Sequence, residues 1–291
     1  MRLTVIVLLF ILVATPVGAQ SHPLSEPVVI PITLAEGLVY IPATLDDSIP
    51  LNVILDTGAG LDVLAPSQVR RAGGKPAGIV TGHRMTGERL DIPLWVVPSL
   101  QVGPLASTDA VVGSWDALDS FGLDGIISLM GFRKQPFTID FAAGTVTLES
   151  PRSLARRRAE GQVSALLLDD LRGRALSAFA AFSLGGELGE CELDTGTQAT
   201  RANTRYLAAL GIDSSDASVT KRSFRAVTGA VENQYVAPVP RVALASAPEV
   251  AATDTRVTFS DIIYDCVIGT SFWQGRALTL DIAGRELIVS Q

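Results

Sequence analysis

Two copies of the tripeptide Asp-Thr-Gly are the part of this sequence best suited to chemistry. One begins at Asp56 and the other at Asp194, and each follows a short, mostly apolar run typical of a buried strand. A single Asp-Thr-Gly is an ordinary turn, because Asp bonds to its own backbone and Gly accepts a positive φ. Two carboxylates at the ends of two apolar strands indicate more than turns, since burying a charge is costly without compensation.

Two aspartates that face each other can share one proton. Like charges at close range cannot both ionise, so the pKa of one carboxyl rises and that of the other falls. Such a pair contains one acid and one base, and it can take a proton from water while it gives one to a carbonyl group. This chemistry requires neither a metal ion nor a covalent intermediate.

The residues that follow each aspartate have expected supporting roles. We expect the hydroxyls of Thr57 and Thr195 to hydrogen-bond across the interface between the two loops. Gly58 and Gly196 should let the backbone come close to the carboxylates, because they carry no side chain.

The two loops differ at the next position, where the first has Ala59 and the second has Thr197. A threonine hydroxyl can stabilise an ionised carboxylate, and an alanine cannot. We therefore expect Asp194 to be the more readily ionised partner and Asp56 the more readily protonated one.

The sequence around the two tripeptides repeats in the same order. A short helix-like stretch, a turn between strand-like runs, a strand rich in Val and Pro, and a closing pair of strands follow each copy. The spacing also agrees, because Asp140 lies 84 residues after Asp56 and Asp281 lies 87 residues after Asp194. An ordered repeat at near-equal spacing is strong evidence for a duplicated unit.

Each half reads as short strands with one short helix, which predicts an all-β fold. We expect one lobe over residues 27–150, a linker over 151–162 and a second lobe over 163–291. The linker contains Arg156, Arg157 and Arg158, which we interpret as part of a solvated connector rather than a basic binding patch.

The composition excludes several classes of function. A net charge of -7 disfavours nucleic-acid binding, which needs a basic face. His22 and His83 are the only histidines and two cysteines are far apart, so no metal-ligand pattern is visible. Phosphate-binding, dinucleotide-binding and serine-nucleophile motifs are also missing from the sequence, and we expect no cofactor.

Residues 1–19 are typical of a signal peptide. Arg2 precedes an apolar run over 5–13, and small residues at Gly18 and Ala19 suit a cleavage site. An uncleaved N-terminal anchor is the alternative. We expect an exported protein, periplasmic or secreted, with no stable membrane span after removal of the leader.

From Pro27 to Gln291, the pattern resembles the clan of pepsin-like and retropepsin-like aspartic peptidases. Besides the two Asp-Thr-Gly loops, Val267-Ile268-Gly269 fits the apolar-apolar-Gly strand of that clan, whereas the first half has Ser128 where the glycine would stand. The resemblance implies a bilobal acid-protease fold built from two tandem retropepsin-like lobes. It also implies that Asp56 and Asp194 are the catalytic pair and that one chain is active as a monomer.

The resemblance further implies two hairpin flaps that bind an extended polypeptide substrate. Their tips are expected at Arg84, Met85, Thr86 and Gly87 in the first half, and at Val227, Thr228 and Gly229 in the second.

The resemblance also places the two cysteines, Cys191 and Cys266, on strands that should be neighbours. They would then form a disulfide that braces the second Asp loop, and two buried free thiols are the alternative.

Three functions are consistent with these features. The first is an exported aspartic endopeptidase. The second is a catalytically weak or inactive peptide-binding protein that keeps the same fold. The third, a generic β protein with two turns, is disfavoured by the ordered repeat.

Overall fold

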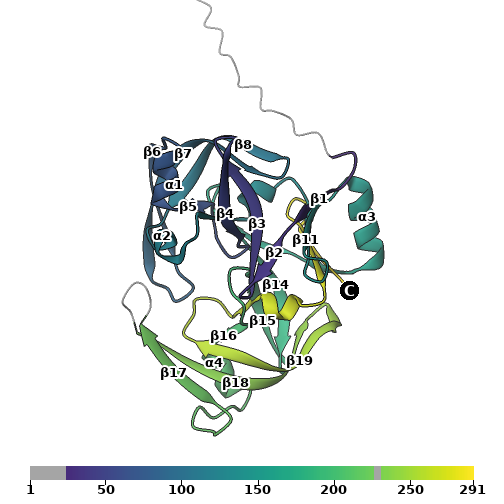
Figure 1. Ribbon diagram of the computed structural model, residues 1–291. Coiled ribbons are helices and arrows are strands. Elements are labelled where there is room, and N and C mark those ends of the chain that lie inside the picture. Colours follow the sequence, from purple (N-terminus) through teal and green to yellow (C-terminus); the bar gives the residue numbers. More distant parts are fainter. Residues whose placement is uncertain (1–23, 226–230) are drawn as a thin grey trace, which may run out of the picture.

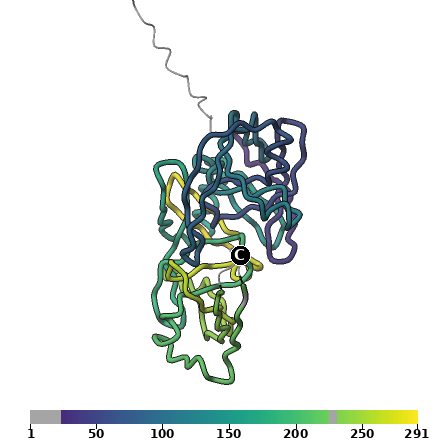
Figure 2. The backbone as a smooth tube through the Cα atoms, turned by 90° about the vertical axis from the view of Figure 1, so that its left-hand side faces the viewer, coloured from purple at the N-terminus to yellow at the C-terminus, as the bar shows by residue number. Residues whose placement is uncertain are grey.

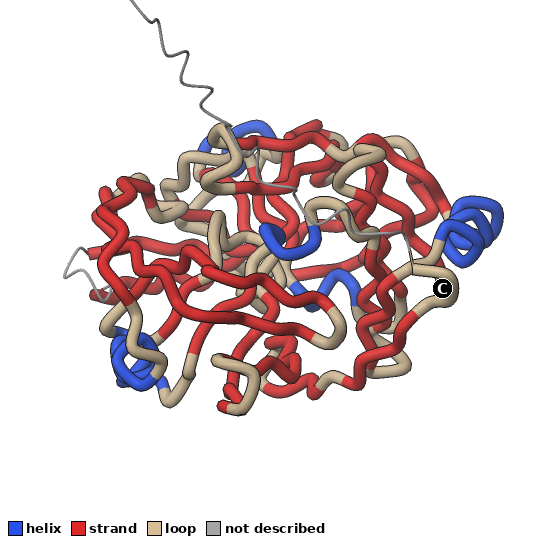
Figure 3. Tube along the Cα trace, turned by 90° about the horizontal axis from the view of Figure 1, so that it is seen from above, coloured by secondary structure: helices blue, strands red, loops and turns tan. Residues whose placement is uncertain are grey.

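The two halves of the chain form two lobes of the same architecture. The computed structural model describes residues 24–225 and 231–291. The first half lies above the second in the view of Figure 1, and the view from the side separates the purple and blue half from the green and yellow one (Figure 2). Strands dominate both halves, and the few helices are short (Figure 3). The expected bilobal all-β fold is therefore confirmed.

Each lobe contains one eight-stranded sheet with the same topology. The first sheet has the order β2 (Thr33–Ala35), β3 (Leu38–Leu45), β4 (Ile49–Leu55), β9 (Gly125–Ile127), β5 (Val63–Leu64), β8 (Leu105–Ser114), β7 (Arg89–Val102), β6 (Lys75–His83). The second has the order β13 (Leu167–Asp170), β14 (Leu176–Leu184), β15 (Glu187–Leu193), β20 (Cys266–Ile268), β16 (Arg201–Asn203), β19 (Ala247–Ser260), β18 (Val231–Leu244), β17 (Thr220–Arg225). The strands correspond one to one, down to the extra pairings β3–β7 and β14–β18, as expected for a duplicated unit.

A six-stranded sheet joins the two lobes. Its order is β1 (Val28–Pro31), β11 (Thr145–Leu148), β10 (Phe137–Asp140), β21 (Ala277–Asp281), β22 (Glu286–Ser290), β12 (Gln162–Ala165). The central pair, β10 and β21, comes from opposite halves and brings Thr138 against Thr279, whose hydroxyl oxygens lie 2.7 Å apart. The lobes are thus held together by backbone hydrogen bonds as well as by side-chain packing.

The helices are short and lie at the ends of strands. They are α1 (Pro66–Arg71), α2 (Ala117–Phe121), the 3₁₀ helix η1 (Leu129–Phe132), α3 (Pro151–Glu160), α4 (Arg205–Ala209) and α5 (Thr270–Trp273). The helices α1 and α4 occupy the two helix-like stretches that repeat in the sequence.

The segment expected as a solvated linker is mostly the helix α3. Ser150 caps it, since its side chain accepts a hydrogen bond from the Ser153 N–H, and Ser153 returns the bond. Leu154 on the helix is buried, so one face of this charged segment packs on the protein.

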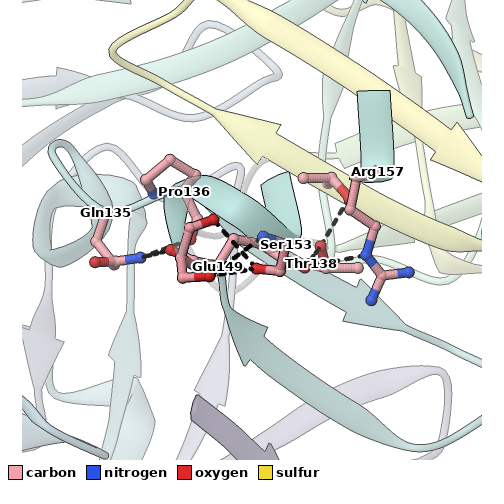
Figure 4. Close-up of polar contacts among 8 residues, drawn as sticks. Gln135, Pro136, Thr138, Glu149, Ser153 and Arg157 are labelled. Carbon is pink, nitrogen blue, oxygen red and sulfur yellow. Dashed lines mark hydrogen bonds and ion pairs between the residues drawn. The ribbon is translucent and has the colours of Figure 1, made fainter. Parts of the chain in front are cut away.

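A buried polar cluster fastens α3 to the joining sheet (Figure 4). Glu149 is 2% exposed, and its Oε1 accepts from the Thr138 hydroxyl at 2.6 Å and pairs with Arg157 Nε at 3.0 Å. Gln135 Nε2 donates to the Glu149 carbonyl at 2.8 Å. The connector is therefore anchored to the joining sheet.

Candidate active site

The two Asp-Thr-Gly loops meet where the lobes face each other. In each lobe a parallel strand pair ends at the loop, β4 with β9 and β15 with β20. The N–H of Asp56 donates to the Ile127 carbonyl at 2.9 Å, and the N–H of Asp194 donates to the Ile268 carbonyl at 3.1 Å. Each aspartate therefore leaves a sheet at a position fixed by its neighbouring strand.

The two threonines hold the loops together in a reciprocal arrangement. The N–H of Thr57 donates to Thr195 Oγ1 at 3.0 Å, and the N–H of Thr195 donates to Thr57 Oγ1 at 3.1 Å. Each hydroxyl then donates to a carbonyl of the other lobe, Thr57 to Leu193 at 2.5 Å and Thr195 to Leu55 at 2.6 Å. Both threonines are fully buried, so these bonds are formed out of water, where leaving the groups unpaired would be costly.

The glycines allow each loop to lie against the aspartate of the other lobe. A Cβ added to Gly58 would lie 2.6 Å from Asp194 Cγ, and one added to Gly196 would lie 2.6 Å from Asp56 Oδ1. No side chain fits at such distances, so glycine is required at both positions.

The carboxyl groups of Asp56 and Asp194 hydrogen-bond to each other. Burial raises the pKa of both groups. The pKa of Asp194 rises further, because the negative charges of Asp56 and Glu192 lie close to it. The geometry thus favours a pair in which Asp194 holds the shared proton.

Backbone donors explain why Asp56 is the better anion. Its Oδ1 accepts from the N–H groups of Gly58 at 2.9 Å and Ala59 at 3.0 Å, whereas Asp194 Oδ1 accepts from Gly196 N–H at 2.8 Å. Among the described residues, no hydrogen bond joins the Thr197 hydroxyl to Asp194. The expectation that Asp194 is the more readily ionised is therefore wrong, because it considered the side chain after each glycine and not the backbone N–H.

Ser128 is accommodated in the first lobe by a partner that the sequence did not reveal. Its N–H and hydroxyl both donate to Asp62 Oδ1, at 2.7 and 2.8 Å, and its Oγ accepts from the Met130 N–H and so caps η1. Burial raises the pKa of Asp62, and the two bonds from Ser128 oppose that rise. The departure from the glycine pattern is thus a hydrogen-bonded unit that supports the strand behind the loop.

The two cysteines form a disulfide, as expected. Cys191 and Cys266 are direct partners in the parallel pair β15 and β20, with Cα atoms 4.4 Å apart and both side chains fully buried. The equivalent positions of the first lobe hold Val53 and Gly125. The bond links the strand that leads to Asp194 with the strand behind it.

A cleft of about 650 Å³ lies between the lobes over the aspartates. The first expected flap is a hairpin of β6 and β7, and Arg84 and Met85 at its tip line the cleft. The Met85 carbonyl accepts from the N–H of Ile263 at 2.8 Å, so the tip touches the other lobe. Thr86 and Gly87 complete the turn, and Gly87 has a φ of 81°.

The tip of the second expected flap, with Val227, Thr228 and Gly229, lies outside the described residues. The expected signal peptide over 1–19 lies outside them as well.

Sequence reasoning missed several residues of the cleft wall, among them Glu192 and Tyr264. A glutamate inside the otherwise apolar run before Asp194 was the available signal for the first of them. In the described segments, no group of three or more His, Cys, Asp or Glu could hold a metal ion. None of the helices in these segments has the length and hydrophobicity needed to cross a membrane.

Comparison with known sequences gives no match to a family model or to a curated protein. The fold, however, resembles solved structures. Basic 7S globulin from soybean is 11% identical, with a TM-score of 0.53 over 91% of this chain and 95% of the other. Conglutin gamma, a basic 7S globulin from lupine seeds, is 10% identical, with a TM-score of 0.54 over 92% of this chain and 95% of the other. At such low identities the likeness extends to the fold alone.

Proposed function

We propose that this chain is an exported aspartic endopeptidase, a member of the pepsin-like and retropepsin-like clan. The observation that carries the proposal is the pair of hydrogen-bonded carboxyls, the half-buried Asp56 and the buried Asp194, on loops that bond to each other at the floor of a cleft. Both carboxyls come from one chain, so a monomer has a complete site.

The mechanism follows from the unequal pKa values of the pair. Asp56, which its backbone N–H donors favour as the anion of the pair, accepts a proton from a water molecule as the oxygen attacks the peptide carbonyl carbon. Asp194 gives its proton to the carbonyl oxygen, which produces a neutral tetrahedral diol. Transfer of the proton from Asp56 to the amide nitrogen then lets the C–N bond break, and the diol returns a proton to Asp194 as the new carboxyl forms.

The flap supports an extended polypeptide as the substrate. Arg84 and Met85 overhang the cleft from a two-stranded hairpin, where the backbone of an extended chain can add as a further strand. Both lobes line the cleft, so an extended chain that lies across it can contact each of them.

A catalytically weak or inactive peptide-binding protein is the second candidate. The observation in its favour is that the two fold neighbours are named as 7S globulins and not as peptidases. An intact aspartate pair does not by itself distinguish these candidates, because catalysis also depends on how the substrate is placed over it.

The deciding experiment is an assay of the chain without residues 1–19 against an extended-peptide library from about pH 3 to 8, with and without pepstatin. We expect cleavage that Asp56→Asn and Asp194→Asn each reduce by about 10²- to 10⁴-fold, the range for one positioned acid or base. Asp109→Asn is the matched control, since Asp109 is exposed and does not line the cleft.

Cleavage that survives either substitution in a folded variant would contradict the mechanism. Peptide binding without turnover in the wild-type protein would favour the second candidate.

A further inference from the structure

The two lobes present different chemistry at equivalent positions of the cleft. Two residues before each aspartate, the first lobe has Ile54 and the second has Glu192, and both line the cleft. Two residues before β9 and β20, the strands behind the loops, the first lobe has Leu123 and the second has Tyr264. Both of these residues also line the cleft. The wall of the first lobe is thus apolar at both positions, whereas that of the second lobe is polar.

The helix α2 extends the apolar wall of the first lobe. Leu118 and Phe121 of this helix and the preceding Trp115 line the cleft, and the rings of Trp115 and Phe121 pack edge to face with centroids 6.2 Å apart. In the second lobe, the equivalent segment between β19 and β20 contains no helix. The contrast between the walls therefore extends beyond the pair of strands that hold the aspartates.

Glu192 is buried without a charged partner. The residue is 3% exposed, and its Oε1 has no hydrogen-bond partner among the described residues. The Ser177 hydroxyl donates to the carboxyl group, and no ion pair of the described chain includes it. A buried carboxyl with an unused oxygen is costly unless a donor reaches it.

The surroundings of Glu192 are acidic. Burial and the nearby charge of Asp56 raise the pKa of Glu192 to about 8. Burial raises the pKa of Asp194 and of the Tyr264 hydroxyl, and the charge of Glu192 raises both further. A cation at this point of the cleft would relieve the repulsion between these groups and supply the missing donor.

We propose that Glu192 is a specificity-determining residue, which receives a lysine or arginine side chain of a bound peptide on the second lobe's side of the cleft. This inference rests on the proposed function in that it takes an extended peptide as the occupant of the cleft. It does not require that the peptide be cut.

Arg201 also lines this wall and limits where the cation lies. Its side chain and that of Glu192 stand on either side of β20, because Val267 pairs with both residues. Arg201 Nε is buried without a hydrogen-bond partner. The cation is therefore expected on the Glu192 side, next to the aspartates, and an acidic side chain on the Arg201 side would be the competing mode of recognition.

The test compares extended peptides that differ at a single residue next to the scissile bond, which is lysine, norleucine, leucine or glutamate. Norleucine has the four-carbon side chain of lysine without the terminal ammonium group. Reduced-amide versions, which cannot be cut, are titrated into the protein by calorimetry, and the cleavable versions give kcat/KM. We expect the lysine peptide to exceed the norleucine peptide by about 10-fold or more in both measurements, the size of one charge-assisted contact.

Glu192→Gln should bring this ratio to about 1, and Glu192→Ile, which recreates the first lobe's residue, should favour norleucine. Glu190→Gln makes the same chemical change at an exposed position of the same strand, outside the cleft lining, and should keep the lysine preference. Binding of lysine should also release a proton, because the cation lowers the raised pKa of Glu192. Calorimetry in two buffers of different ionisation enthalpy measures that release, which Glu192→Gln should abolish.

The outcomes separate this inference from the proposed function. Peptides that bind or are cut without a lysine preference, a preference that survives Glu192→Gln, or a preference for glutamate would each overturn the inference and leave the function intact. Lysine-selective binding without cleavage would support the inference and count against the peptidase. A protein that binds none of the peptides would overturn both.

Discussion

The two lobes have the same topology but brace their aspartates by different means. The second lobe ties the strand before Asp194 to the strand behind it with the disulfide of Cys191 and Cys266. The first lobe has Val53 and Gly125 there, and it instead uses the Asp62–Ser128 hydrogen bonds at the end of β9. The reciprocal hydrogen bonds of Thr57 and Thr195, here called the threonine interlock, are the same from both sides. The shared site thus requires symmetry where the loops meet and tolerates different supports behind them.

The cleft shows a second difference, with consequences for chemistry. The charge of Glu192 acts on Asp194, and its counterpart Ile54 has none. The backbone N–H groups that favour an anion are more numerous on Asp56. Two loops at equivalent places in the same topology therefore hold carboxyls with unequal proton affinities, as an acid–base pair requires.

At a fixed pH, the largest expected loss of stability comes from replacing the second lobe's disulfide with the residues that the first lobe has at the same positions. Cys191→Val combined with Cys266→Gly removes a disulfide that closes a loop of 75 residues. We expect the free energy of unfolding to fall by about 4 kcal/mol, because the unfolded chain gains freedom. Urea unfolding measures it. Wild-type protein unfolded under reducing conditions should show a similar loss, and a loss below about 1 kcal/mol would show that the bond does not brace this lobe.

Ser128 and Gly269 occupy equivalent positions behind the two loops. Exchanging them should lower the free energy of unfolding by the next largest amounts, and the two amounts should differ. A Cβ at Gly269 would lie 2.6 Å from the carbonyl oxygens of Gln198 and Ala199, so Gly269→Ser should cost about 3 kcal/mol. Ser128→Gly removes the hydroxyl's bonds to Asp62 and Met130 without a clash, keeps the backbone N–H bond to Asp62, and should cost about 1–2 kcal/mol. Denaturant titration of the two variants gives both values. Equal costs would mean that the two lobes support their loops alike.

The threonine interlock should respond equally from both sides. Thr57→Val leaves the Thr195 N–H and the Leu193 carbonyl unpaired, and Thr195→Val does the same to the opposite groups. We expect each to lower the free energy of unfolding by about 2 kcal/mol. Thermal unfolding of the two variants side by side tests this, and a difference larger than about 1 kcal/mol would show that the interlock is asymmetric.

The last expected effect is on the pH dependence of stability. The raised pKa of Glu192 means that the folded protein keeps a proton that the unfolded chain releases above its ordinary pKa of 4.5. Stability should therefore fall as the pH rises from about 4.5 to about 8, and Asp56 and Asp194 contribute a fall of the same sign.

Glu192→Gln should flatten this fall, whereas Glu190→Gln should leave it unchanged. Melting temperatures at intervals across this pH range provide the measurement. Parallel curves for wild type and Glu192→Gln would contradict the raised pKa.

The sequence by itself determined the duplicated unit, the two Asp loops and the all-β class. These follow from local patterns: apolar runs that end in Asp-Thr-Gly, turn residues at matching places, and near-equal spacing. The pairing of Cys191 with Cys266 could also be expected once the strands behind the loops were assigned, because the pleat of neighbouring strands brings such positions together.

Only the tertiary structure decided how the site is tuned. Which aspartate holds the proton depends on backbone N–H groups and on Glu192, and a sequence does not show the direction in which an N–H points. The helix α3 has few apolar residues, so its pattern indicated a solvated linker, yet a buried Glu149–Arg157 pair holds it in place. Ser128 departs from the glycine pattern, and its hydrogen-bond partner Asp62 lies 66 residues away in the chain, so only the fold reveals the pair. Local patterns specify strands and turns, whereas proton affinities and buried polar pairs depend on groups that meet only when the chain folds.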